Sequence, residues 1–150
     1  MTTASRVELR RSLNVPAERV FAAFADATLV AQWLRPSPDV KLDVLELEFR
    51  EGGRYRFAYE VPDGTRMIVG GLYRRIEPPR CIVFSWLIEP PDEHAGIASE
   101  VTVLLEQRGS ATELLIRHER WERDDAEARH SLGWQGALDL LEAQLERGAL

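Results

Sequence analysis

Few side chains in this sequence have a type and spacing suited to chemistry, and they do not form a catalytic set. The histidines His94, His118 and His130 lack the short spacing of metal ligands. Cys81 is the only cysteine, so neither a disulfide within the chain nor a cysteine-based metal site can form. Ser85 lies in a predicted strand with no obvious base beside it. We therefore expect no catalytic residue, no metal and no cofactor.

Three polar side chains are predicted on the inward side of their strands. For His118 this favours a hydrogen-bonded histidine at the rim of a cavity over an acid or base. The hydroxyl of Tyr59 is expected to hydrogen-bond a ligand or to reach solvent. Arg11 either extends outward to solvent or pairs with a carboxylate. An acid or base site would need such a carboxylate, or Arg11, beside His118.

The composition is that of an ordinary globular chain of 150 residues, which we expect to form one domain, 1–150. The net charge of −6 argues against nucleic acid as a partner. No apolar run is long enough for a membrane span, and Met1 to Leu9 contain no signal-peptide core. The single cysteine fits a reducing compartment, so a cytoplasmic location is expected.

The pattern near the start predicts a strand followed by two short helices. Apolar and polar residues alternate from Val7 to Val15, as in a half-buried strand. Pro16 suits the first turn of the next helix, and Asp26 is placed to cap a second helix that ends near Trp33. Both helices are too short to be stable alone, so we expect them to pack on a sheet.

Alternating segments then predict six more strands, about seven in all. An apolar phase switch between Val44 and Leu45 indicates a β-bulge, and Gly70-Gly71 is another candidate for a bend or bulge. Turn residues such as Pro62-Asp63-Gly64 separate the strands at the short spacing of an antiparallel sheet. With the helices, this predicts the α+β class.

The segment Asp125 to Arg147 predicts one long amphipathic helix, and Asp124 with Glu127 resembles a capping box. Its apolar face needs the sheet to lie on. Gly133 and Gly136 weaken a helix, which indicates close approach of another backbone or space left for something else. A curved sheet around one helix often leaves a hollow, and the prediction of function rests on that hollow.

Inward residues of the strands and the apolar face of the helix would line this hollow. Trp86 and Trp134 are expected on opposite walls, as core residues or as a binding surface. Trp33 and Trp121 are expected to be packing residues or lids near the mouth. The predicted ligand-binding residues are Tyr55, Phe57, Tyr59, Phe84, Trp86, Leu114, Ile116, His118, Trp134, Leu138 and Leu141.

Several short motifs, together with the order of elements, match a known family. The motifs are Pro16-Ala17-Glu18-Arg19-Val20-Phe21, Trp33, Gly52-Gly53, the run from Gly71 to Trp86, and Gly133-Trp134. From about Val7 to Leu145 the chain resembles the heat-shock-protein-90 ATPase activator homologue family of the START-like (SRPBCC, Bet v 1-like) superfamily.

This resemblance implies a helix-grip fold, in which a strongly curved antiparallel sheet wraps around the last helix and hydrophobic small molecules commonly bind between the two. We expect such a ligand and no catalysis, with a homodimer allowed. A cyclase or hydrolase acting on a polyketide-like or aromatic substrate, as among superfamily relatives, is the first alternative. The second is modulation of the heat-shock-protein-90 ATPase by protein contact. Eukaryotic members use an additional N-terminal domain for that task, and this sequence starts at the first predicted strand, so we do not expect a chaperone partner.

Overall fold

The computed structural model describes residues 6–90, 98–119, 124–148 and 150, and the backbone alone for 124–130. Within these residues the chain forms seven strands and three helices. The predicted order of elements, with two short helices after the first strand and a long helix at the end, is confirmed. In chain order the elements are β1 (Arg6–Leu13), α1 (Ala17–Ala25), α2 (Ala27–Trp33), β2 (Lys41–Leu47), β3 (Arg54–Glu60), β4 (Arg66–Glu77), β5 (Cys81–Ile88), β6 (Ala98–Arg108), β7 (Ala111–Glu119) and α3 (Asp124–Glu146).

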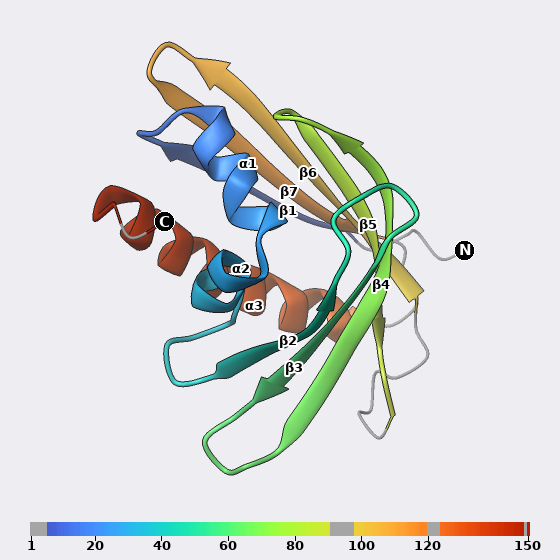
Figure 1. The fold of residues 1–150 in the computed structure, drawn as a ribbon. Coiled ribbons are helices and arrows are strands. Elements are labelled where there is room, and N and C mark those ends of the chain that lie inside the picture. Colours follow the sequence, from blue (N-terminus) through green and yellow to red (C-terminus); the bar gives the residue numbers. More distant parts are fainter. Residues whose placement is uncertain (1–5, 91–97, 120–123, 149) are drawn as a thin grey trace.

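The strands form one antiparallel sheet in the order β1-β7-β6-β5-β4-β3-β2. Figure 1 shows the sheet strongly curved, with α3 on its concave side and the two short helices beside it. This is the predicted helix-grip arrangement of the α+β class. Among the described residues, no helix combines the length and the apolar character needed to cross a membrane.

Two register shifts interrupt the pairing of the strands. β2 shifts against β3 after Val44, where the apolar phase switch predicted a bulge. The second shift lies between β4 and β5 after Tyr73, while β4 keeps its register with β3 through Gly70-Gly71, so of the bend or bulge considered at these glycines the bulge is not present. Gly71 is required for a steric reason, because a Cβ atom there would lie 2.1 Å from the carbonyl oxygen of Ser85. The glycine therefore lets the two backbones come close together.

Specific hydrogen bonds position the two short helices. The carboxylate of Asp26 accepts from the backbone N–H groups of Thr28 at 2.8 Å and Leu29 at 3.2 Å, so the predicted cap of α2 is present. The indole N–H of Trp33 donates to the carbonyl oxygen of Ala23 at 2.9 Å, which ties the end of α2 to α1. Trp33 is completely buried and is therefore a packing residue.

Helix α3 is fastened on both sides. On one side, a Cβ atom at Gly136 would lie 1.8 Å from the carbonyl oxygen of Pro36, so the helix touches the backbone of the loop between α2 and β2. On the other side, Arg11 of β1 donates to the Asp139 carboxylate at 3.1 Å. Of the two roles considered for Arg11, the structure therefore has the arginine paired with a carboxylate.

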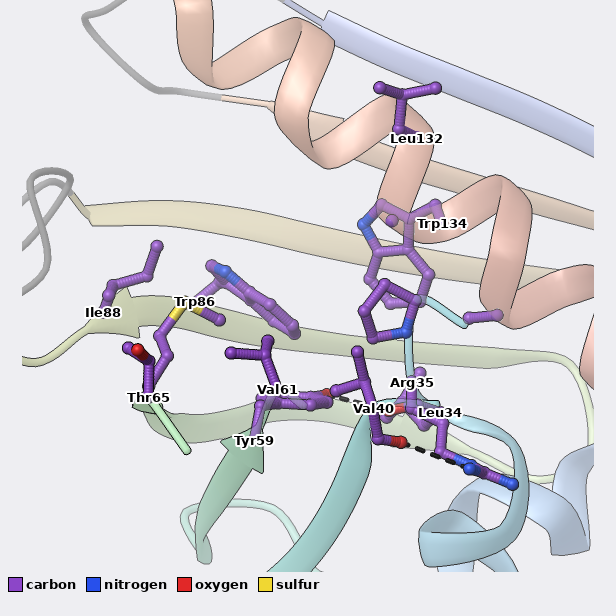
Figure 2. A pocket seen from close by; sticks show the side chains of 14 residues that line it. Leu34, Arg35, Val40, Tyr59, Val61, Thr65, Trp86, Ile88, Leu132 and Trp134 are labelled. Carbon is purple, nitrogen blue, oxygen red and sulfur yellow. Dashed lines mark hydrogen bonds between the residues drawn. The ribbon is translucent and has the colours of Figure 1, made fainter. Parts of the chain in front are cut away.

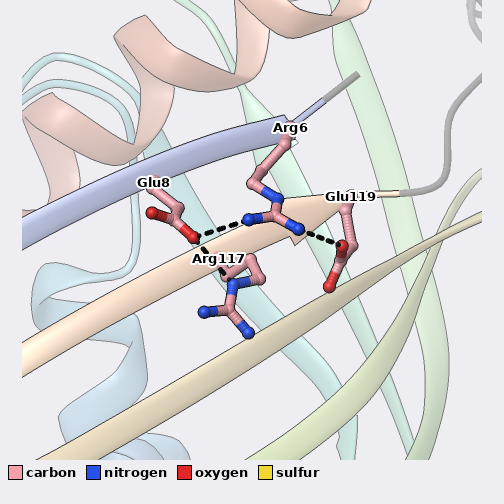
Figure 3. Close-up of polar contacts among 4 residues, drawn as sticks. All are labelled: Arg6, Glu8, Arg117 and Glu119. Carbon is pink, nitrogen blue, oxygen red and sulfur yellow. Dashed lines mark hydrogen bonds and ion pairs between the residues drawn. The ribbon is translucent and has the colours of Figure 1, made fainter. Parts of the chain in front are cut away.

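The outer face of β1 and β7 is ionic (Figure 3). Glu8 accepts from Arg117 at 2.9 Å and from Arg6 at 3.1 Å, and Arg6 also lies 3.7 Å from Glu119. The hydrogen bond from Arg117 lowers the pKa of Glu8 below its ordinary value of 4.5. Because the polar side chains are outside and the apolar ones inside, a site for an apolar ligand belongs on the concave side.

Candidate functional site

A cavity of about 430 Å³ lies between the concave face of the sheet and α3 (Figure 2). Its third wall is the segment 34–40, which we call the α2–β2 loop. Leu132 is 71% exposed and Val61 is 36% exposed, so the cavity opens between α3 and the β3–β4 hairpin. The lining residues are Leu34, Arg35, Pro36, Val40, Tyr59, Val61, Thr65, Met67, Trp86, Ile88, Leu132, Gly133, Trp134 and Ala137.

Most of this lining is carbon. Trp86 on β5 and Trp134 on α3 have ring centroids 5.7 Å apart and rings inclined by 48°. These two residues and Tyr59 are the members of the predicted lining that border the cavity. Met67, which pairs with Tyr59 across β3 and β4, and Ile88 extend the sheet wall. A largely apolar cavity of this size is typical of small-molecule sites.

The two glycines of α3 have different roles in keeping this space open. Of the described residues, a Cβ atom at Gly133 would meet only the Pro36 side chain, at 3.9 Å, so the helix leaves room there. Gly136 is the position where the helix touches the α2–β2 loop. Close approach and free space were the two explanations considered for these glycines, and each holds for one of them.

The hydroxyl of Tyr59 faces the α2–β2 loop. It donates to the carbonyl oxygen of Leu34 at 2.9 Å, and both residues border the cavity. Tyr59 is buried, so its hydroxyl does not reach bulk solvent. Burial raises the pKa of the Tyr59 phenol well above its ordinary value of 10.0, so the group is an uncharged hydroxyl at neutral pH.

Arg35 is the only formally charged residue in the described lining, and its head group braces the loop. Nη1 donates to the carbonyl oxygens of Pro38 at 2.8 Å and Val40 at 3.2 Å, and Nε donates to that of Gln32 at 3.3 Å. Figure 2 shows the guanidinium against the Val40 carbonyl, with the stem of the side chain at the cavity. The arginine therefore contributes mainly carbon to the wall.

A buried chain of hydrogen bonds connects the two tryptophans behind the wall. The indole Nε1–H of Trp134 donates to Nδ1 of His118 at 3.0 Å, so Nδ1 carries no proton. The neutral imidazole then has its proton on Nε2, which donates to Ser99 Oγ at 2.7 Å. Ser99 donates in turn to the Trp86 carbonyl oxygen at 3.2 Å. These bonds link α3 to three adjacent strands and specify the tautomer of His118.

His118 lies behind the cavity wall, not at the rim where it was expected. Its side chain is completely buried, and its ring stands edge-on to Trp86 at 5.4 Å and to Trp134 at 6.3 Å. Arg11, which was considered as its partner in an acid or base site, binds Asp139 instead. With hydrogen bonds at both ring nitrogens, His118 supports the wall from behind.

The remaining predicted lining residues lie away from the cavity. Tyr55, Phe57 and Phe84 surround a void of only about 10 Å³, because Phe24 of α1 and Val30 of α2 fill that end of the groove. The other predicted residues are buried in the core. They are Leu114, Ile116, Leu138 and Leu141.

Sequence reasoning missed the loop wall and the mouth. Pro36 belongs to a segment without periodicity, where it predicted only the end of a helix, and Val40 was assigned only to the alternation with Leu42 and Val44. Ile88 had a usable signal, since it shares the inward face of β5 with Trp86. Leu132 lies off the apolar stripe of α3, so nothing in the pattern predicted its place at the mouth.

Within the part of the chain that the structure describes, no three histidine, cysteine, aspartate or glutamate side chains gather as metal ligands. His94, Trp121 and His130 lie outside the described side chains, as do Asp124 and Glu127 of the predicted capping box.

Comparison with protein families gives the same relationship as the sequence motifs. Residues 14–146 match the family described as activator of Hsp90 ATPase homolog 1-like protein. The chain belongs to this family. The resemblance drawn from the sequence is thus confirmed, while no curated protein matches the chain.

Solved structures share the fold over nearly the whole chain. Protein CV1439 from Chromobacterium violaceum is 29% identical with a TM-score of 0.86, covering 94% of this chain and 96% of its own. The AHSA1 protein from Silicibacter pomeroyi is 25% identical with a TM-score of 0.85, covering 96% and 99%. Mll3558 from Rhizobium loti is 27% identical with a TM-score of 0.78, covering 95% and 97%. The scaffold shared with this family is of the ligand-binding type.

Proposed function

We propose that this protein binds an apolar small molecule in the cavity between the sheet and α3, without catalysing a reaction. The observation that carries the proposal is a space of about 430 Å³ that is open to solvent and lined mostly by carbon. Water in such a space has few partners, so an apolar ligand would replace it favourably. Burial would supply about 25 cal/mol per Å² of apolar surface before the costs of association.

Hydrogen bonds within the protein hold the walls of the cavity in place. His118 holds Trp134, and Arg35 together with the hydroxyl of Tyr59 holds the α2–β2 loop. A site whose side chains are already held loses less conformational entropy on binding than a site that must be ordered by its ligand. This supports binding in a preformed cavity over a role that needs the walls to rearrange.

Titration with N-phenyl-1-naphthylamine, an uncharged hydrophobic dye, tests the proposal. Because Trp86 and Trp134 border the cavity, binding should quench tryptophan emission while dye emission rises. Gly133→Leu should place a side chain in the free space and weaken binding at least about tenfold, since it removes volume that the dye needs.

Gly133→Ala is the matched control, because a single methyl group fits at that position. It should bind the dye nearly as well as the wild type. Absence of binding to the wild type, or equal binding to the wild type and a folded Gly133→Leu variant, would refute the proposed function.

A further inference from the structure

The lining of the cavity contains a buried hydroxyl oxygen that can accept a hydrogen bond from a ligand. The Tyr59 hydroxyl donates its proton to Leu34, and no described residue donates to its oxygen. A phenolic oxygen can accept as well as donate. Tyr59 borders the cavity and is 6% exposed, so a donor brought by a ligand could meet this oxygen away from bulk water.

The charges around the cavity disfavour an ionised ligand. The described lining includes no carboxylate, so a cation entering the cavity would meet no opposite charge. An anion would meet only Arg35, whose Nε and Nη1 already bind the backbone carbonyl of Gln32 at the end of α2 and those of Pro38 and Val40. Because burying an unpaired charge is costly, the cavity favours an uncharged molecule.

The aromatic walls favour a flat molecule. Trp86 and Trp134 lie on different elements and are inclined by 48°, so they present two ring surfaces beside the aliphatic side chains of the lining. The Trp134 N–H is turned to His118, so this indole offers its carbon surface to the cavity. Offset and edge-to-face packing against such rings stabilises aromatic ligands beyond the area that they bury.

We infer that the ligand is an uncharged aromatic ring compound whose hydroxyl or N–H group donates a hydrogen bond to Tyr59 Oη. This inference rests on the proposed function, because it names the chemical class that the same cavity takes. It makes Tyr59 the residue that distinguishes a phenol-like or indole-like ligand from a plain hydrocarbon of the same shape.

Two probes of similar shape test this inference: 2-naphthol, which has a donor, and 2-methylnaphthalene, which has none. Calorimetric titration of the wild type and Tyr59→Phe gives the effect of the hydroxyl on each probe. The substitution should weaken 2-naphthol about 3- to 10-fold and leave 2-methylnaphthalene within about twofold, as expected for one hydrogen bond. The difference in hydrophobicity between the probes cancels, because each is compared with itself.

Tyr55→Phe is the matched control. Tyr55 is also buried on β3 and its hydroxyl donates to the Ser85 carbonyl oxygen at 2.6 Å, but it does not border this cavity. The Tyr55→Phe variant should lose a comparable hydrogen bond within the fold, but its affinity for 2-naphthol and for 2-methylnaphthalene should not change. Circular dichroism of both variants checks that they are folded, and 2-naphthoate tests the requirement for an uncharged ligand in the wild type alone.

The outcomes separate this inference from the proposed function. If both neutral probes bind and Tyr59→Phe affects them equally, or if Tyr55→Phe has the same selective effect, the role of Tyr59 is refuted while cavity binding stands. Binding of 2-naphthoate as tight as that of 2-naphthol refutes the uncharged class. If no probe binds the wild type, the proposed function fails and this inference fails with it.

Discussion

The two ends of the groove between sheet and helix are built from the same kinds of side chain, yet one is solid and the other is hollow. At the solid end the ring of Tyr55 lies 4.7 Å from that of Phe57 and 5.5 Å from that of Phe84, around a void of about 10 Å³. At the hollow end Trp86 and Trp134 border about 430 Å³. Aromatic content therefore does not decide where a helix-grip fold keeps its cavity.

The difference comes from what covers each end. α1 and α2 lie over the solid end and insert Phe24 and Val30 among the rings of the sheet. Among the described residues the hollow end is covered by the α2–β2 loop, which contacts α3 at Gly136, and α3 contributes no side chain at Gly133. The cavity is thus the part of the concave face that the short helices do not reach.

The largest effect that tests this comparison is expected from Phe84→Ala against Ile88→Ala, two inward positions on β5. Phe84 is packed on all sides, so its loss should reduce the free energy of unfolding by about 3–5 kcal/mol. Ile88 should cost about 2 kcal/mol, because its side chain is smaller and it borders the cavity. Chemical denaturation measures both values. Equal losses would show that the two ends are packed alike.

A second test uses the two glycines of α3. Gly136→Ala forces a methyl group against the Pro36 carbonyl and should reduce the free energy of unfolding by about 3 kcal/mol. Gly133→Ala should be neutral or gain up to about 1 kcal/mol, because alanine favours the helix and the space is free. Thermal and denaturant melts of both variants check the prediction. A harmless Gly136→Ala would mean that the loop can move away from the helix.

The fold followed from the sequence because its signals are local. Alternation identified the strands, Asp26 marked the start of α2, and the phase switch at Val44 marked the bulge in β2. The register shift after Tyr73 was not predicted, because Gly70-Gly71 was the more obvious candidate for a bend or bulge in this strand. Gly71 is needed because the backbone of the neighbouring strand β5 lies too close for a side chain. The residue pattern of a single strand does not reveal such a contact.

The candidate site was predicted less completely because it depends on contacts between distant segments. Parity correctly placed Tyr59, Trp86 and Trp134 on the concave side, where they border the cavity. Parity could not show that α1 fills the region of Phe57, nor that His118 would be enclosed behind two indoles. Both features depend on how the short helices and the α2–β2 loop pack in the tertiary structure.

The hydrogen-bonded histidine gives a third, smaller effect. His118→Leu leaves the Trp134 N–H without its partner and should cost about 2 kcal/mol, and it should also weaken dye binding because the indole is no longer held. Thr112→Val is the control: Thr112 is equally buried, and its hydroxyl bonds the Val15 carbonyl at 2.7 Å, away from the cavity.

Thr112→Val should cost about 1 kcal/mol and leave dye binding unchanged. Nitrogen chemical shifts of the His118 ring in the wild type give an independent check, with the proton expected on Nε2. A proton on Nδ1, or dye binding that responds equally to both variants, would contradict the role of His118 as a support for the wall.

The smallest effect is expected on the outer face, where Glu8→Gln should alter stability slightly and dye binding not at all. Arg117 lowers the pKa of Glu8 in the folded protein, so this carboxylate stabilises the fold above its ordinary pKa of 4.5. The contribution disappears as the pH falls through the lowered folded-state value. In urea melts between pH 7 and pH 3, the free energies of unfolding of wild type and variant should therefore become equal in acid. They should also become equal at high salt, because the ion pair is exposed to solvent. A gap that persists in acid, or a change in dye affinity, would mean that the ionic face and the cavity are coupled.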